Sequence, residues 1–259
     1  MTSVTSTATV IRQAGRMNVQ VFENRERMGE AAANDVANVL RAVLAKQDSV
    51  RMVFAAAPSQ AQMLAALCAA PGIDWSRVVA FHMDEYIGLA PAAPERFARW
   101  LDDNLFERVP FAEVHRIVPG PDPAAAAEAY AALLAEAPID IICLGIGVNG
   151  HVAFNDPPVA DFNDPLDVKV VTLDAECRQQ QVDDKCFAQL ADVPRQAITL
   201  TVPRLMRANR LFCVVPGGQK REAVRATLHG PVSTSCPASI LREHADCTLY
   251  LDAESYPDA

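Results

Sequence analysis

The sequence predicts one α/β domain with a Rossmann-like, doubly wound and mostly parallel sheet flanked by helices. Short apolar runs, typical of strands, alternate along the chain with longer segments of helical periodicity. Some of these runs, such as residues 141–144, carry no alternating polar residue, as expected for strands buried on both faces. Three runs lead into polar clusters or glycine turns, which is how such a sheet presents chemistry at its carboxyl edge.

The individual elements follow from the same patterns, in chain order. The Ser/Thr-rich residues 1–16 are expected to form a loose tail, and the domain is expected to span residues 17–259. Apolar runs predict strands over residues 18–22, 51–57, 77–81, 113–118, 141–144, 167–172, 197–202, 210–215 and 247–251. Helices are predicted after Asn24, which can cap the first one, after Ser59, over residues 94–106, 123–135 and 175–190, around Lys220, and over 237–244. No internal repeat or linker divides the chain.

Composition narrows the functional classes. The 259 residues are 51% hydrophobic and carry a net charge of -9, so no basic field exists to attract nucleic acid or anionic lipid. The seven cysteines are scattered without a CxxC pair, which is typical of reduced thiols in a cytoplasmic protein. The first sixteen residues lack the apolar core of a signal peptide, and no apolar run reaches the ~20 residues needed to span a bilayer. We therefore expect a cytoplasmic protein with no membrane partner.

Three predicted strands end in residues suited to chemistry. The first is followed by Asp84-Glu85, the second by Asn149 to Asp156 with His151 between them, and the third by the GGQK segment that ends at Lys220. Each cluster alone is equally compatible with solvated loop residues. Together they supply an acid-base site next to an anion site, because the carboxyl ends of neighbouring strands meet at one edge. This combination suits a phosphorylated metabolite that undergoes proton transfer.

Four segments resemble one known family. The stretches FHMDEYIGL (81–89) and LGIGVNGHVAFNDPP (144–158) are similar to the two signature stretches of the glucosamine-6-phosphate deaminase/isomerase family, and GGQK (217–220) and GPVSTSCPASILREH (230–244) resemble its later segments. The similarity runs in order from about Phe22 to Asp252. The family also includes 6-phosphogluconolactonases, but Tyr86 and the AFND segment (153–156) resemble the deaminase side.

The resemblance implies an aldose-ketose isomerisation of a phosphorylated amino sugar, with loss of ammonia and without a metal or organic cofactor. It implies that Asp84 is the base that moves a proton from C2 to C1, that His151 opens the sugar ring, and that Asn149 and Asp156 orient the imidazole. The phosphate is expected to bind Lys220 and the turn Pro58-Ser59-Gln60, with Arg178 or Lys185 as a second cationic contact. Glu85 and Gly147 complete the expected set of substrate-binding residues.

This chain departs from the family pattern in several places. Many members have Asp at the position of Asn149 and Glu at that of Asp156, and an amide orients an imidazole without stabilising its charged form. The resemblance implies glucosamine 6-phosphate or a close epimer as substrate. Residues 57–61 lack the glycines of the family's phosphate loop, which leaves the sugar open between glucosamine, galactosamine and another sugar phosphate. The chain stops soon after its last predicted strand, so a monomer or small homo-oligomer is expected. The alternatives are a sugar lactone hydrolase and a non-catalytic sugar-phosphate-binding protein on the same scaffold.

Overall fold

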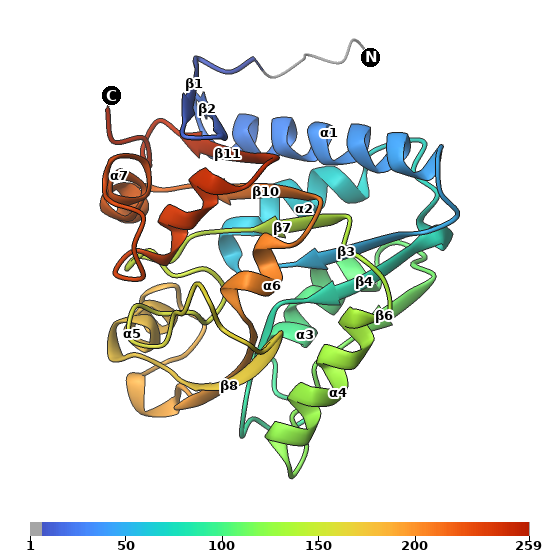
Figure 1. Cartoon of the computed structure of the whole chain (residues 1–259), viewed down its shortest axis with the longest axis vertical. Helices are drawn as coiled ribbons and strands as arrows, with labels where there is room; N and C mark the ends of the chain where they lie inside the picture. Colours follow the sequence, from blue (N-terminus) through green and yellow to red (C-terminus); the bar gives the residue numbers. More distant parts are fainter. Residues whose placement is uncertain (1–6, 259) are drawn as a thin grey trace.

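The main sheet contains eight strands. The computed structural model describes residues 7–258, and the strand order is β1-β2-β11-β10-β7-β3-β4-β6 (Figure 1). Their bounds are β1 Val10–Ala14, β2 Met17–Phe22, β3 Val50–Phe54, β4 Val78–His82, β6 Glu113–His115, β7 Ile141–Leu144, β10 Arg210–Val215 and β11 Cys247–Asp252. All neighbouring pairs are parallel except β1 with β2. The predicted fold class is therefore confirmed.

The strand order reverses between β3 and β7. From β3 the chain proceeds outward through β4 to β6, and it then returns to the other side of β3 as β7, followed by β10 and β11. A reversal of this kind leaves a crevice at the carboxyl ends of the two central strands, which is where doubly wound sheets bind ligands. The topology thus places β3, β4, β7 and β10 around one potential site.

Helices cover both faces of this sheet. Their bounds are α1 Arg25–Leu44, α2 Ala61–Cys68, α3 Phe97–Leu101, α4 Pro123–Ala135, α5 Ala175–Asp183, α6 Val202–Met206 and α7 Arg221–His229. Short turns of other helical types are η1 Pro58–Gln60, η2 Trp75–Arg77, the π-helical η3 Asp102–Phe106, η4 Leu190–Asp192, η5 Gly218–Lys220 and η6 Pro237–Glu243. Residues of α1, α2 and α3 pack in the core on one face, and residues of α4, α6 and α7 pack in the core on the other. In Figure 1, α1 runs along the top of the view and α4 lies at the lower right.

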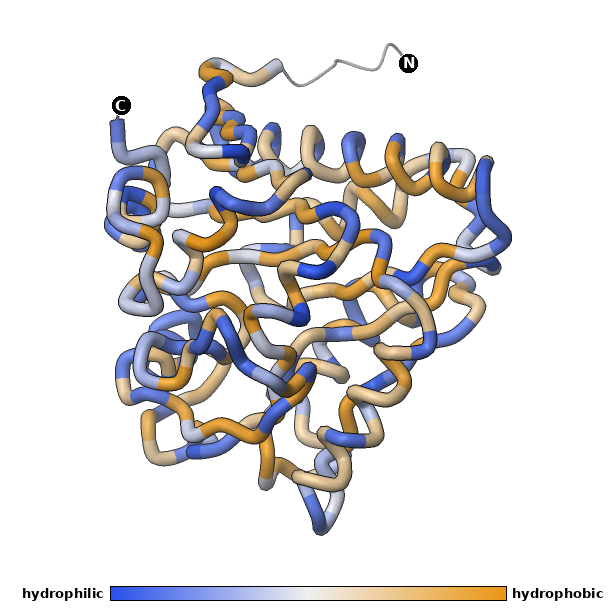
Figure 2. The backbone as a smooth tube through the Cα atoms, viewed as in Figure 1, coloured by the Kyte–Doolittle hydropathy of each residue, from blue (hydrophilic) through white to orange (hydrophobic). Residues whose placement is uncertain are grey.

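Two hydrophobic cores result from the period-two alternation along the strands. In β3, Met52 and Phe54 pack into the core beneath α1 and α2, whereas Val53 packs into the core beside α4 and α7. The apolar residues concentrate accordingly in the central strands (Figure 2). The prediction for α1 is confirmed, because the Asn24 side chain accepts a hydrogen bond from Arg27 N at 2.9 Å and so caps the helix.

A second, smaller sheet adjoins the carboxyl edge of the first. It consists of β5 (Asp84–Tyr86), β9 (Gln196–Leu200) and β8 (Val168–Thr172), all paired antiparallel. The sequence predicted β8 and β9 as strands but missed β5, whose polar residues carry no strand pattern. The small sheet matters for function because it holds the Asp84 backbone beside the main sheet.

Several predicted bounds need correction. Residues 10–14 were expected in a loose tail but form β1, because they pair with β2 from Val10↔Val21 to Ala14↔Met17. Residues 1–6 lie outside the described part. Helix α3 is shorter than predicted and continues as η3, and α5 ends at Asp183, just before Lys185 with its φ of +61°. Segment 237–244 is mostly the 3₁₀-type η6, and α6 was not predicted. Within residues 7–258, no helix combines the length and apolarity that crossing a membrane requires.

Candidate active site

A cavity of about 530 Å³ opens at the carboxyl ends of β3, β4, β7 and β10. Its lining includes residues 55–60 after β3, Asp84 after β4, residues 145–147 and His151 after β7, and Lys220 after β10. The three strand ends that the sequence singled out therefore meet in one place, and the turn after β3 completes the rim. The position is the strand-order reversal at which doubly wound sheets bind ligands.

Asp84 is a deeply buried carboxyl group at the cavity wall. Its residue is 6% exposed, although it lines the cavity. Burial raises the pKa of Asp84 well above its usual value, and the nearby negative charges of Glu85 and Asp156 raise that pKa further. A carboxylate with a raised pKa is a stronger base than an exposed one. The environment therefore suits Asp84 to proton transfer.

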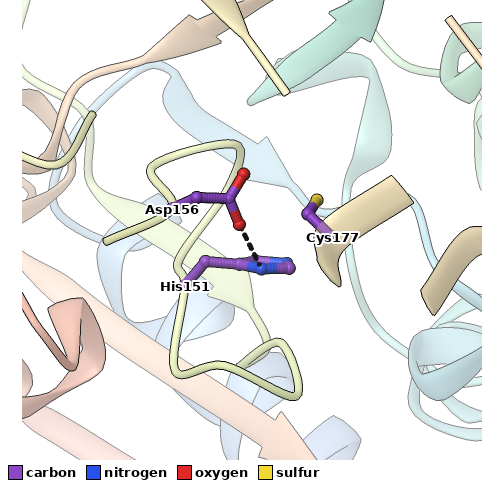
Figure 3. A group of neighbouring side chains, drawn as sticks. All are labelled: His151, Asp156 and Cys177. Atoms are coloured by element: carbon purple, nitrogen blue, oxygen red, sulfur yellow. Dashed lines mark ion pairs between the residues drawn. The ribbon is translucent and has the colours of Figure 1, made fainter. Parts of the chain in front are cut away.

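His151 is fixed in one tautomer by two oxygen acceptors. Its Nδ1 lies 2.8 Å from Asn149 Oδ1 and 2.9 Å from Asp156 Oδ1, the pair drawn in Figure 3. Neither oxygen can donate a proton when Asp156 is ionised, so we assign the ring proton to Nδ1. Nε2 then carries the lone pair. A ring with this tautomer, in the wall of the cavity, can take a proton from a substrate hydroxyl.

Asn149 and Asp156 hold each other as well as the imidazole. Asn149 Nδ2 donates to Asp156 Oδ1 at 3.0 Å, and Asn149 Oδ1 also accepts from His151 N at 3.0 Å. Burial alone would raise the pKa of Asp156, but its hydrogen bond and charge interaction with His151 and the bond from Asn149 hold that pKa below its usual value. The carboxylate that stabilises a protonated His151 is therefore Asp156, and Asn149 acts as the bridge between them.

Gly147 makes room for the His151 ring. A Cβ atom at Gly147 would lie 2.1 Å from His151 Cε1, so any side chain there would displace the imidazole. Gly147 N also donates to His151 O at 2.9 Å, which closes the loop after β7. Gly147 does line the cavity as predicted. Glycine is required at position 147 because the His151 ring occupies the space that a side chain would need.

Lys220 provides a buried cation in the cavity wall. The residue is 4% exposed, and its backbone N–H donates to Gly217 O, whereas its ammonium group has no hydrogen-bond partner within residues 7–258. Burial lowers the pKa of Lys220 to about 8, and the negative charge of Asp184 partly opposes this shift. Gly217, at a φ of +93°, starts the η5 turn that carries Lys220. An anion such as phosphate would supply the partner that this ammonium lacks.

The turn Pro58-Ser59-Gln60 forms η1 beside the end of β10, and all three residues line the cavity. Gln60 Nε2 donates to Val214 O at 3.1 Å and to Ser59 Oγ at 3.3 Å. Its Oε1 is buried without a hydrogen-bond partner among residues 7–258. Gln60 therefore offers an acceptor rather than the free backbone of a glycine loop. Lys185 also lines the cavity, so its wall contains two lysines.

Two predicted site residues, Glu85 and Arg178, lie outside the lining of this cavity. Glu85 accepts from Phe97 N at 3.1 Å and Ala98 N at 3.0 Å, so it binds the first turn of α3, where Arg96 also reaches it at 3.4 Å. Arg178 donates to the carbonyl oxygens of Leu190 and Val193 at 2.7 and 2.8 Å. Neither residue lines the cavity. Of the two candidate phosphate cations, the structure brings only Lys185 to the site.

Sequence reasoning missed the polar wall that α5 contributes. Gln180, Gln181 and Asp184 line the cavity. Gln180 Oε1 accepts from Val148 N at 3.0 Å, and its Nε2 donates to Asp184 Oδ2 at 3.2 Å. Gln180 thus ties α5 to the His151 loop. The run of three glutamines before two aspartates and Lys185 was the available signal, because such a run is unusual on a helix that packs against a core.

The side chains most suited to hold a metal ion are His151, Asp156 and Cys177, whose ligand atoms all lie within 4.8 Å of one another (Figure 3). Burial raises the pKa of the Cys177 thiol, which keeps it protonated at neutral pH. His151 Nδ1 is already occupied by its two acceptors. We therefore interpret this group as a hydrogen-bonded support for His151.

Comparison with known proteins agrees with this geometry. The glucosamine-6-phosphate deaminases of Exiguobacterium sibiricum and Listeria monocytogenes are 36% and 34% identical over 71% of this chain, and over 71% and 76% of their own lengths. The structure of a monomeric glucosamine-6-phosphate deaminase superposes with a TM-score of 0.84 at 25% identity, covering 92% of this chain and 98% of that one. The 6-phosphogluconolactonase of Thermotoga maritima, at 18% identity and a TM-score of 0.73, shares the fold.

A sequence profile described as glucosamine-6-phosphate isomerases/6-phosphogluconolactonase matches residues 23–250. This span contains all the strand ends around the cavity, and it contains Asp84, His151 and Lys220 within them. The chain belongs to the glucosamine-6-phosphate isomerase/6-phosphogluconolactonase family.

Proposed function

We propose that this protein is an amino-sugar-phosphate deaminase/isomerase. It converts glucosamine 6-phosphate, or a close epimer, and water to a ketose 6-phosphate and ammonia. The observation that carries the proposal is the meeting of Asp84, His151 and Lys220 in the wall of one cavity. The names of the relatives, which are glucosamine-6-phosphate deaminases, support the same reaction.

Ring opening is the first step, and His151 performs it. Its Nε2 takes the proton of the C1 hydroxyl and returns a proton to the ring oxygen, which breaks the C1–O5 bond and leaves an aldehyde at C1. Asp156 stabilises the transient imidazolium from 2.9 Å, and Asn149 keeps the ring in place. The replacement of Asp by Asn at position 149 is therefore compatible with ring opening.

Proton transfer between C2 and C1 is the second step, and Asp84 performs it. Its carboxylate removes the C2 proton while O1 gains the proton that the ammonium group loses, which gives an enolamine as the enediol-type intermediate. The same carboxyl group then delivers its proton to C1, and the nitrogen at C2 becomes an iminium. Water then adds at C2, where nitrogen is bound as this iminium, and ammonia leaves as the ketone forms. The substrate's ammonium group would offset the negative charges that raise the pKa of Asp84, so the carboxylate ionises when the amino sugar is bound.

Phosphate binding holds the sugar for both steps. Lys220 and Lys185 supply the charge, and Ser59 and Gln60 line the same cavity and complete this end. The ammonium group of Lys220 makes no hydrogen bond within residues 7–258, so binding a phosphate does not require the side chain to break an existing contact. This pre-organisation lowers the cost of binding.

A panel of four phosphorylated compounds tests the proposal. Purified protein is incubated with glucosamine 6-phosphate, galactosamine 6-phosphate, glucose 6-phosphate and 6-phosphogluconolactone. We expect equal amounts of ammonia and ketose 6-phosphate from at least one amino sugar. Lactone hydrolysis above the spontaneous rate, without ammonia release from either amino sugar, would assign the other activity of the family. Thermal stabilisation by an amino sugar without any turnover would identify a binding protein.

We also propose that the protein works in the cytoplasm, as a monomer or a small homo-oligomer. All seven cysteines are free thiols, and four of them are buried, which suits a reducing compartment. The relative with a TM-score of 0.84 is described as monomeric. Sedimentation velocity at micromolar concentration distinguishes the two assembly states, and an assembly larger than a dimer would contradict the proposal.

A further inference from the structure

His82 lies at the point where the chain leaves the main sheet and enters the small one. Strand β4 ends at His82 and β5 begins at Asp84, with Met83 between them. The direction in which the Asp84 side chain points therefore depends on the backbone conformation at His82 and Met83, where the chain passes from one sheet to the other. The His82 side chain is fully buried, and it does not line the cavity.

The His82 ring makes two hydrogen bonds with backbone groups on either side of this passage between the sheets. Its Nδ1 lies 2.9 Å from Asp84 O, and Ile117 N donates to its Nε2 at 2.8 Å. Because Nε2 accepts a hydrogen bond from the backbone N–H of Ile117, the ring proton must be on Nδ1, which donates to the Asp84 carbonyl. Burial lowers the pKa of His82 to about 3, so the ring remains neutral in this one tautomer at working pH.

The Asp84 carbonyl receives no partner from its own sheet. Leu200 N donates to Met83 O at 2.8 Å and Ile87 N donates to Gln196 O at 3.0 Å. In an antiparallel pair, such bonds involve alternate residues of each strand, so Asp84, opposite Thr199, turns its carbonyl away from β9. Since β5 is at the edge of the small sheet, the imidazole of His82 takes the place of a neighbouring strand.

The backbone of His82 is itself anchored. Tyr130 Oη on α4 accepts from His82 N at 3.0 Å and lies 2.9 Å from His82 O and 3.2 Å from His115 O. A continuous series of buried hydrogen bonds therefore links Tyr130 on α4, through His82, to the Asp84 carbonyl. A fixed anchor at one end and a neutral, single-tautomer ring at the other can hold the Asp84 backbone in one orientation.

We propose that His82 is the positioning residue for the base: through the Asp84 carbonyl, its neutral ring fixes where the Asp84 carboxylate lies relative to the substrate. The inference rests on the proposed role of Asp84. It predicts an effect on kcat rather than on KM, because the hydrogen bonds of His82 join it to Asp84, Ile117 and Tyr130 and not to the proposed phosphate-binding residues. A displacement of about 1 Å at a reacting group costs about 10²-fold in rate.

Two amide variants separate positioning from mere stability. In His82→Asn, the amide nitrogen replaces Nδ1 and keeps the donor to Asp84 O, but the acceptor for Ile117 N is lost. In His82→Gln, the longer side chain reaches toward Ile117 N and loses the donor to Asp84 O. Both variants leave one buried backbone group unpaired, so both should lower Tm. We expect kcat per folded protein to fall about 10²-fold in His82→Gln and to stay within about 3-fold of wild type in His82→Asn, with KM little changed in either.

A purely structural histidine would give the same kcat in both variants, or equal losses that follow Tm, and either result overturns the proposal. The ring itself is tested in the unaltered protein by ¹⁵N NMR of its imidazoles. His82 should remain neutral with its proton on Nδ1 from pH 5 to 9, whatever the protein's activity. A charged ring or the other tautomer would overturn the proposed positioning role of His82. Absence of ammonia release from both amino sugars would instead overturn the proposed function, which keeps the two failures distinct.

Discussion

The cost of burying the Asp84 carboxylate is a property of a single residue. Burial and the charges of Glu85 and Asp156 disfavour its ionised form. The folded protein is therefore less stable when Asp84 is ionised than when this carboxyl group is protonated. We predict that Asp84→Asn lowers kcat by about 10³-fold or more, as expected for loss of a general base, while Tm at pH 8 stays equal to or above that of wild type. Ammonia release and differential scanning calorimetry measure the two effects.

The matched control for this pair of measurements is Asp103→Asn, because Asp103 is exposed, with 52% of its side chain accessible, and pairs with Arg99 on the surface. That variant should retain wild-type kcat. If Asp84→Asn kept normal turnover, Asp84 would not be the base; if it lost turnover together with several degrees of Tm, its carboxylate would be a structural group.

Lys220 should give the pH profile its basic limb. The free ammonium has a pKa of about 8 because of burial, and only its protonated form attracts phosphate. Raising the pH through 8 therefore removes a charge from the free enzyme, and kcat/KM should fall over that range while kcat falls less, because bound phosphate raises the pKa of Lys220. In Lys220→Arg the side chain stays charged, so this limb should move upward by at least one pH unit.

Initial rates between pH 6 and 10 test this prediction, with Lys46→Arg as the same change at an exposed position. An identical basic limb in wild type and Lys220→Arg would assign the limb to another group. Substrate phosphate is already a dianion above pH 7, so its own titration does not compete with the effect.

The sequence predicted the grouping of site residues well where these residues belong to one local motif. Asn149, His151 and Asp156 lie within eight residues of one another, and they do form one hydrogen-bonded unit. The sequence did not reveal that Asp156, despite its short side chain, reaches Nδ1 directly. That contact depends on the fold of the loop, including Gly147 beneath the ring, and no spacing rule contains it.

At the scale of elements, α5 and the turn after it carry two cationic side chains, Arg178 and Lys185, that have different roles. Arg178 holds the segment that follows by binding two carbonyl oxygens, whereas Lys185 lines the cavity. We predict that Lys185→Ala raises KM about tenfold with kcat within about twofold, since it removes one cationic phosphate contact worth roughly 1.5 kcal/mol. Arg178→Ala should instead lower Tm by several degrees, at roughly 2–4 °C for each kcal/mol lost.

Steady-state kinetics and thermal unfolding of both variants, beside the same measurements on wild type, decide between the roles. A large rise in KM for Arg178→Ala without any change in Tm would reverse the assignment. Lys185 is exposed at the cavity mouth, so its removal should leave Tm nearly unchanged, which makes each variant the control for the other.

A short polar strand explains why the sequence predicted a place in the site for Glu85 as well as for Asp84. Asp84 and Glu85 are adjacent in β5, and successive side chains of a strand point to opposite faces. One carboxyl group therefore enters the cavity while the other meets the first turn of α3. Without apolar alternation the segment could not be recognised as a strand, and the two acids were assigned the same role.

At the scale of the whole molecule, the reversal of strand order brings together residues that are far apart in the chain. The alternation of strands and helices was sufficient to predict this fold class and the meeting of the strand ends after β4, β7 and β10. It could not predict the small antiparallel sheet, whose β5, β9 and β8 come from distant segments. Long-range antiparallel pairing of this kind has no local sequence signal.

Binding at this reversal should stabilise the entire domain, because the ligand contacts both halves of the sheet at once. A ligand at about 100 times its Kd adds about 2.7 kcal/mol to the free energy of unfolding, which corresponds to a Tm increase of roughly 5–11 °C at 2–4 °C per kcal/mol. We predict such an increase with saturating fructose 6-phosphate and none with the same concentration of fructose, because Lys220 is paired only by the phosphate. Lys220→Ala should abolish the increase. Differential scanning fluorimetry measures it, and equal shifts from the two sugars would place the ligand's main contacts away from Lys220.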